Sequence, residues 1–214
     1  MSIIWESAID KCHQEVAGTY DSIATLRPII TMRRQAQMNT INKTPMDIKD
    51  ATLSGIMNSE GVIEWYINLE CGSIQLHGHT TTPRIYLERF EWDIQFVGEI
   101  TNKNIIIENG AHFSNHTILL GNRLCCLYVF EHEFLFDNQI SFYLKDQELH
   151  VQWKAHNSNS VEEKYVIDID TKIDFLGLNL GNIELADAKE ILKFNTSGLL
   201  FYEEEGTLYL IPDE

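Results

Sequence analysis

Residues 84–96 read RIYLERFEWDIQF, and this stretch decides how the rest of the chain is interpreted. Apolar and polar side chains alternate along it with a period of two, which is typical of a β-strand with one buried face. The predicted apolar face is interrupted only by Glu88 and consists of Tyr86, Phe90, Trp92, Ile94 and Phe96. The opposite face is polar and consists of Arg89, Glu91, Asp93 and Gln95. The pattern predicts an antiparallel strand with one side in water.

Similar strands are expected through most of the chain after Val62. Short apolar runs between turn residues predict further strands over residues 104–108, 117–120, 124–130, 134–136, 140–144, 149–154, 165–169 and 173–178. The turn Asn109-Gly110 is the strongest hairpin signal in the chain. Near the end, a short helix is predicted over residues 184–194. It is followed by a hairpin of residues 199–203 and 207–211.

The first sixty residues carry a helical spacing instead. Trp5, Ile9, Cys12 and Val16 form one apolar stripe, and the run from Thr44 to Asp47 resembles the start of a second helix that ends at Gly61. The sequence therefore predicts an α+β fold. We expect a mostly antiparallel β-sandwich or partly closed barrel with N-terminal helices and a short C-terminal helix. Residues 1–214 are expected to form a single domain, with a helical segment over 1–61 packed on a β-rich core over 62–214.

The chain is strongly acidic. It has 32 Asp and Glu residues against 16 Lys and Arg residues, a formal net charge of −16. Residues 160–214 hold 13 acidic and 4 basic residues, a net charge of −9. Such a chain repels nucleic acid and anionic membranes and attracts cationic partners. The first residues lack the basic region and apolar run of a signal peptide, so a cytoplasmic location is expected.

Motifs for catalysis or cofactor binding are absent from the sequence. There is no Gly-x-Ser-x-Gly nucleophile elbow, no dinucleotide fingerprint and no phosphate-binding loop. The four cysteines form no Cys-x-x-Cys pair, which disfavours zinc ribbons and redox sites and favours reduced, buried thiols. No catalytic residue and no cofactor are therefore assigned, and a binding protein is favoured over an enzyme.

The favoured hypothesis is an acidic intracellular protein that neutralises a cationic protein partner. In size and charge the chain resembles, as a class, the bacterial immunity proteins that inhibit secreted or contact-delivered nuclease toxins. A nuclease must be basic where it grips nucleic acid, so an acidic inhibitor can occupy that surface with fast association. The candidate partner-binding residues share a place in the acidic last quarter and are Asp168, Asp170, Asp174, Glu203, Glu204 and Glu205.

The alternative hypothesis is a metal site built on histidines. The order of Gly72, His77, His79 and Glu88 resembles the first motif of the cupins, in which two His and a Glu hold a metal. The gaps differ from the spacing of that family, and its second motif is not found. This alternative implies a cupin-like or barrel-like metal-binding or small-ligand-binding protein or enzyme. Its metal ligands would be His77 and His79, with His116 as a third.

Overall fold

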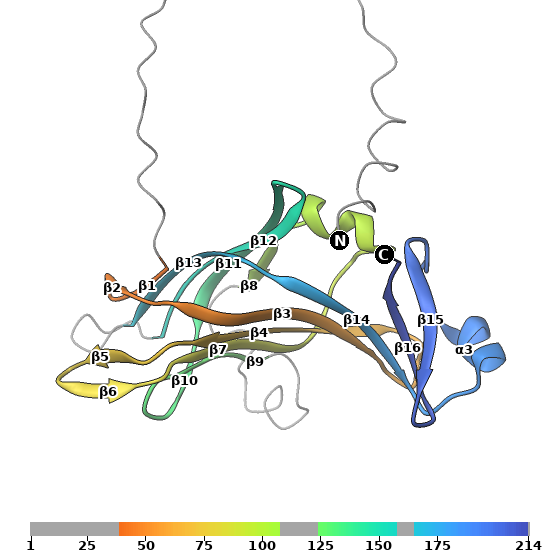
Figure 1. The fold of residues 1–214 in the computed structure, drawn as a ribbon, viewed down its shortest axis with the longest axis horizontal. Helices are drawn as coiled ribbons and strands as arrows, with labels where there is room; N and C mark the ends of the chain where they lie inside the picture. The colour runs from red at the N-terminus through yellow and green to blue at the C-terminus, as the bar shows by residue number, and fades with distance from the viewer. Residues whose placement is uncertain (1–38, 108–123, 158–164, 214) are drawn as a thin grey trace, which may run out of the picture.

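The computed structural model describes residues 39–107, 124–157 and 165–213, and they form mostly β-sheet (Figure 1). Six strands form sheet A, in the order β2 (Thr44–Pro45), β1 (Thr40–Ile41), β13 (Val166–Lys172), β12 (Glu148–His156), β11 (Phe136–Lys145) and β8 (Ile105–Ile107). Eight strands form sheet B, in the order β10 (His132–Phe134), β9 (Leu124–Tyr128), β7 (Arg84–Glu91), β4 (Ile63–Cys71), β3 (Ile48–Met57), β14 (Asp174–Gly181), β16 (Thr207–Pro212) and β15 (Leu199–Glu204). A hairpin of β5 (Ile74–Leu76) and β6 (His79–Thr81) forms a separate two-stranded sheet.

The two large sheets share one apolar core. Alternate residues of each central strand are buried, because successive side chains of a strand point to opposite faces. Sheet A contributes Val151, Trp153 and Ile169, and sheet B contributes Leu53, Ile67 and Leu87. The rings of Trp92 and Phe142 lie 5.1 Å apart, so the core is continuous between residues that follow β7 and residues of sheet A.

Two of the passages between the sheets take one buried residue each, Leu135 between β10 and β11 and Ile173 between β13 and β14. Ile173 lies between β13 in sheet A and β14 in sheet B, and the two strands run on from one another along the long axis of the molecule (Figure 1). β14 pairs in parallel with β3, and the other described strand pairs are antiparallel. The prediction of an antiparallel, β-rich fold is confirmed.

The prediction of an α+β fold with N-terminal helices is wrong. The segment interpreted as a second helix forms β2 and β3, and the first predicted helix lies outside the described residues. Ala51, Leu53 and Gly55 are buried with partly exposed Thr52 and Ser54 between them. Thr, Ser and Gly are poor residues for a helix interior, and pairing with β4 and β14 fixes the extended form. A Cβ atom at Gly55 would lie 2.6 Å from side-chain atoms of both neighbouring strands, so this position is tightly packed.

Helix is scarce in the described part of the chain. It holds the 3-10 helix η1 (Val97–Asn102) and the α-helix α3 (Leu185–Ile191), which confirms the predicted C-terminal helix. The terminal hairpin of β15 and β16 is also as predicted, and its turn has positive φ at Glu205 and Gly206. That backbone matches the right-handed twist of the two strands. The Asn109-Gly110 turn and the strand predicted over 117–120 lie outside the described residues.

The strand β7, which begins at Arg84, contains a bulge. Arg89 has a φ of 55°, and the pairing of β7 with β4 shifts between Trp65 and Ile67. A bulge adds one residue and moves later side chains to the other face. Ile85 and Leu87 are therefore buried before it and Phe90 after it, while Tyr86 lies on the outer face. The prediction that Tyr86 and Phe90 share one buried face is wrong for this reason.

Candidate functional site

Two of the predicted partner-binding acids belong to a polar network on the outer face of sheet A. Asp170 accepts hydrogen bonds from the Tyr143 hydroxyl and from Nε2 of Gln152, the latter at 3.2 Å. Asp168 lies opposite Lys154 across the ladder, with 3.5 Å between Nζ and Oδ2. Asp168 is therefore paired with a cation, whereas the Asp170 side chain is only 13% exposed and is engaged by two neutral donors, so neither carboxylate is well placed to meet a partner.

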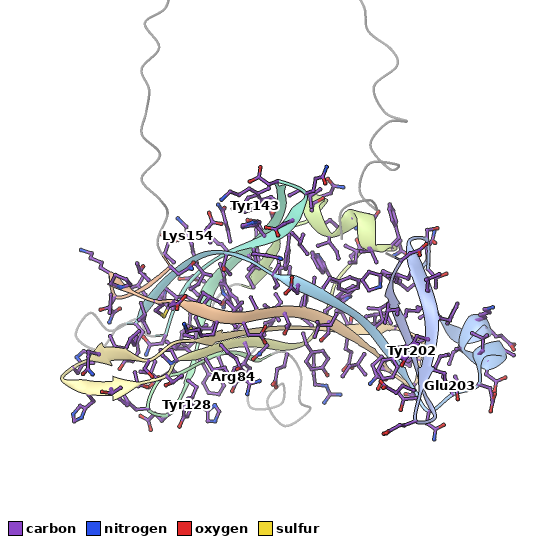
Figure 2. All side chains as sticks on the ribbon, in the orientation of Figure 1. Arg84, Tyr128, Tyr143, Lys154, Tyr202 and Glu203 are labelled. Carbon is purple, nitrogen blue, oxygen red and sulfur yellow. The ribbon has the colours of Figure 1, made fainter. Side chains whose placement is uncertain are left out.

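The other four acids lie on sheet B, three of them in one hairpin. Asp174 begins β14 and pairs with Lys172, with 3.6 Å between Oδ1 and Nζ. Glu203 and Glu204 end β15, Glu205 lies in the turn, and all three are exposed. Figure 2 places Lys154 and Glu203 toward opposite ends of the molecule. The six predicted acids therefore do not form one surface, and the hairpin carries the concentrated part of them.

Exposed apolar side chains lie beside the hairpin acids. Register relations place Ile56, Asn179, Tyr209 and Tyr202 directly opposite one another across β3, β14, β16 and β15. Residues paired this way point to the same face of a sheet. Tyr202 is 45% exposed and Ile56 is 41% exposed.

Two leucines extend this apolar row. Leu200 precedes Tyr202 by two residues on the same face and is 50% exposed. Leu176, beside the bulge of β14, is 58% exposed. We call this surface the C-terminal patch, and it consists of Ile56, Leu176, Leu200, Tyr202 and Tyr209.

Strand alternation distributes the acids unequally around the patch. Glu204 is two residues from Tyr202 and so lies on the same face, whereas Glu203 pairs with buried Leu208 and points to the other face. β15 is also the last strand of sheet B, so its outer edge has no described neighbouring strand. An exposed edge can accept another chain, and charged residues on such a strand limit nonspecific pairing. The hairpin therefore combines apolar side chains, a strand edge and carboxylates.

The two described histidines of the predicted metal site have separate neighbours. His77 lies in the turn between β5 and β6, with a φ of 51°, while His79 begins β6. The ring centroid of His77 is 6.0 Å from that of Tyr165, and the ring centroid of His79 is 6.0 Å from that of Phe130. His116 lies outside the described residues. Within residues 39–107, 124–157 and 165–213, no three His, Cys, Asp or Glu side chains are grouped to hold a metal ion.

Sequence reasoning missed the apolar component of the patch. The sequence places Leu200 and Tyr202 in a strand of the terminal hairpin, but it does not indicate that their face of the strand is the one left exposed. The available signal was the alternation within residues 199–204, where Leu200, Tyr202 and Glu204 share a face. Ile56 and Leu176 could not be joined to them, because that requires the parallel pairing of β3 with β14.

Neither helix of the described residues has the length and apolar character needed to cross a membrane. Comparison with protein-family models, with curated proteins and with solved structures found no match to this chain.

Proposed function

We propose that this protein binds a basic protein partner through the C-terminal patch and the adjoining acids of the β15–β16 hairpin. The observation that carries the proposal is the patch itself: exposed and half-buried apolar side chains from four adjoining strands, with Glu204 on the same face. A cluster of exposed apolar residues with a polar rim is typical of a protein–protein interface. Tyrosine is enriched among the residues that dominate such interfaces.

The charge of the chain supports a basic partner over an acidic one. The formal net charge is −16, and Glu203, Glu204 and Glu205 extend beyond the apolar row at the exposed end of a hairpin. Long-range attraction of this kind raises the rate of association, and it is screened beyond about 8 Å at physiological ionic strength. Apolar contacts at the patch would then hold the complex after the acids have steered it.

A nuclease toxin is the partner class that agrees best with this chemistry. Such an enzyme carries Lys and Arg where it holds phosphate groups, and an acidic hairpin with an apolar face can cover that surface. Under this proposal the protein acts inside the producing cell as an immunity protein, and no catalytic residue or cofactor is needed.

The test is to immobilise the protein, purify each retained partner, and measure association kinetics with the purified pair at two salt concentrations. We expect a basic protein whose association rate falls steeply with added salt. Glu204→Lys should slow association about tenfold, because it reverses the charge on the patch face. Glu203→Lys is the matched control and should have a smaller effect, since its side chain points away from the patch. Tyr202→Ala should accelerate dissociation.

Two results would overturn the proposal. One is a partner that is acidic or is not a protein. The other is an association rate that neither salt nor Glu204→Lys changes, which would mean that the acids only protect the strand edge.

A further inference from the structure

An open groove lies on the outer face of sheet B at the end away from the C-terminal hairpin. Its volume is about 830 Å³, within the usual range for a small-molecule site. The groove is lined mainly by side chains of β4, β7, β9 and β10, among them Glu70, Arg84, Tyr86, Tyr128 and His132. Figure 2 shows Arg84 and Tyr128 on this surface, far from Tyr202 and Glu203.

Sheet register arranges the lining in two rows. Glu70, Arg84, Tyr128 and His132 lie directly opposite one another across β4, β7, β9 and β10. In the second row, Tyr86 lies between Asn68 and buried Cys126. The two rows place the Arg84 guanidinium, the Glu70 carboxylate and the rings of Tyr86 and Tyr128 side by side on one face of the sheet.

Contacts within the groove hold its polar groups in place. Nε of Arg84 donates a hydrogen bond of 2.6 Å to Oδ1 of Asn68, and the guanidinium lies 5.7 Å from the centre of the Tyr86 ring. The Tyr86 hydroxyl is 2.8 Å from Nδ1 of His132. Burial, with a smaller effect from Cys126, raises the pKa of Tyr86 above its ordinary value of 10.0, so its hydroxyl stays protonated in alkaline solution as well as at neutral pH. The site is therefore organised before any ligand arrives.

The groove is balanced in charge, unlike the protein as a whole. Its lining contains two basic residues, Lys49 and Arg84, and two acidic residues, Glu70 and Glu88. Because the two carboxylates offset the two cations, the lining itself attracts neither an anion nor a cation. A neutral ligand remains, and it must offer both donors and acceptors, since Arg84 donates and Glu70 accepts.

We propose that this groove binds a neutral carbohydrate. The C–H face of a sugar ring packs on the ring of Tyr128, which is 40% exposed, in the way that apolar surface packs on aromatic side chains. Arg84 and Glu70 hydrogen-bond the sugar hydroxyls, and Tyr86 with His132 forms a polar wall. The groove is open rather than enclosed, so a chain of several sugar units can lie along it. This proposal is independent of the partner surface at the other end of the sheet.

The test uses isothermal titration calorimetry with a panel of neutral trisaccharides: maltotriose, cellotriose, mannotriose, xylotriose and triacetylchitotriose. Trigalacturonate and spermine serve as the anionic and cationic comparisons. We expect at least one neutral trisaccharide to bind with a Kd below about 1 mM, and neither charged compound to bind comparably. Tyr128→Ala should weaken that binding about tenfold, because it removes the stacking surface.

Control variants separate the groove from the fold. Tyr202→Ala removes a similarly exposed tyrosine from the other end of sheet B and should leave sugar binding unchanged. Tyr128→Phe keeps the ring and should retain most of the affinity, while Arg84→Met should lose it without removing the aromatic surface. Circular dichroism checks that each variant is folded.

The proposal is overturned if no trisaccharide binds at about 10 mM, a concentration at which even a millimolar Kd gives clear occupancy, or if a charged compound binds more tightly. It is equally overturned if Tyr202→Ala weakens sugar binding as much as Tyr128→Ala.

Discussion

Two ends of the outer face of sheet B carry the same kind of exposed residue in different surroundings. Tyr202 at the C-terminal patch is 45% exposed and Tyr128 at the groove is 40% exposed. Tyr202 lies opposite Tyr209 and two residues from Glu204, whereas Tyr128 lies between Arg84 and His132. One end is apolar with an acidic rim, and the other is polar and balanced in charge.

The difference shows that the exposure of a tyrosine does not by itself indicate which kind of ligand its surface binds. A tyrosine beside aliphatic residues and a carboxylate is suited to a basic protein, because its ring extends an apolar contact area. A tyrosine beside a positioned guanidinium and carboxylate is suited to a small polar ligand, because the neighbours supply directed hydrogen bonds. The neighbours come from other strands, so the register of the sheet decides which chemistry each end offers.

The largest expected effect is a loss of stability in Gly177→Ala, which should damage the hairpin end of sheet B and spare the groove end. Gly177 has a φ of 95°, and a Cβ atom there would lie 2.2 Å from the backbone oxygen of Leu210 on β16. Gly177→Ala should therefore lower the free energy of unfolding by about 3 kcal/mol, since strain and overlap add. Urea denaturation would measure this loss. We expect partner binding at the hairpin to weaken in this variant while sugar binding at the groove persists.

Gly181→Ala is the control for that experiment. Gly181 also has a positive φ, 83°, but a Cβ atom added there would meet no other atom within 4 Å. Only backbone strain remains, so the cost should be about 1 kcal/mol. Equal losses in the two variants would contradict the view that close contact between β14 and β16 holds the hairpin.

A smaller loss in the free energy of unfolding should appear at alkaline pH, and its source should be a buried thiol near the groove. The three described cysteines lie in β4 and β9, and burial raises the pKa of Cys71 from 9.0 to about 12, with smaller contributions from Asp47 and Glu70. The unfolded thiol ionises near pH 9 and the folded thiol does not. The stabilisation is therefore complete below about pH 9 and is lost as the pH rises toward about 12. For one such thiol the loss is about 1 kcal/mol at about pH 10.

Urea denaturation at about pH 8 and about pH 10, on either side of the ionisation of the unfolded thiol, would check this expectation. Cys71→Ala should reduce the difference in stability between the two pH values, even though the variant is less stable at both because packing is lost. The same pH difference in the variant and the parent protein would show that the thiol does not couple to folding.

The smallest effects should come from the charged residues of the two surfaces. Arg84 lies 4.0 Å from Glu70, with both side chains more than half exposed, and Glu204 is exposed on the hairpin. Arg84→Gln and Glu204→Gln should each change the free energy of unfolding by less than about 0.5 kcal/mol, because exposed ion pairs contribute little. Thermal melting would test this. A large loss in either variant would mean that the residue supports the fold rather than a binding surface.

Local chemistry in the sequence was sufficient for the terminal hairpin and the short helix near residue 185. Each depends on residues adjacent in the chain, such as Glu205-Gly206 with positive φ or the apolar spacing of α3. The acidic hairpin was found by the same means. The helix start signal from Thr44 to Asp47 led to a wrong prediction, because a short segment of this kind fits a helix as well as a strand until a neighbouring strand is known.

The amino-acid sequence by itself determined the antiparallel β character, the terminal hairpin turn and the acidity of this protein, since alternation, turn residues and charge are properties of short segments. The tertiary structure decided the rest. The bulge at Arg89 separated Tyr86 on the outer face from buried Phe90, and the parallel pairing of β3 with β14 joined Ile56 to Tyr202. The physical reason is that strand pairing connects residues far apart in the chain, and a shift of one residue exchanges the two faces.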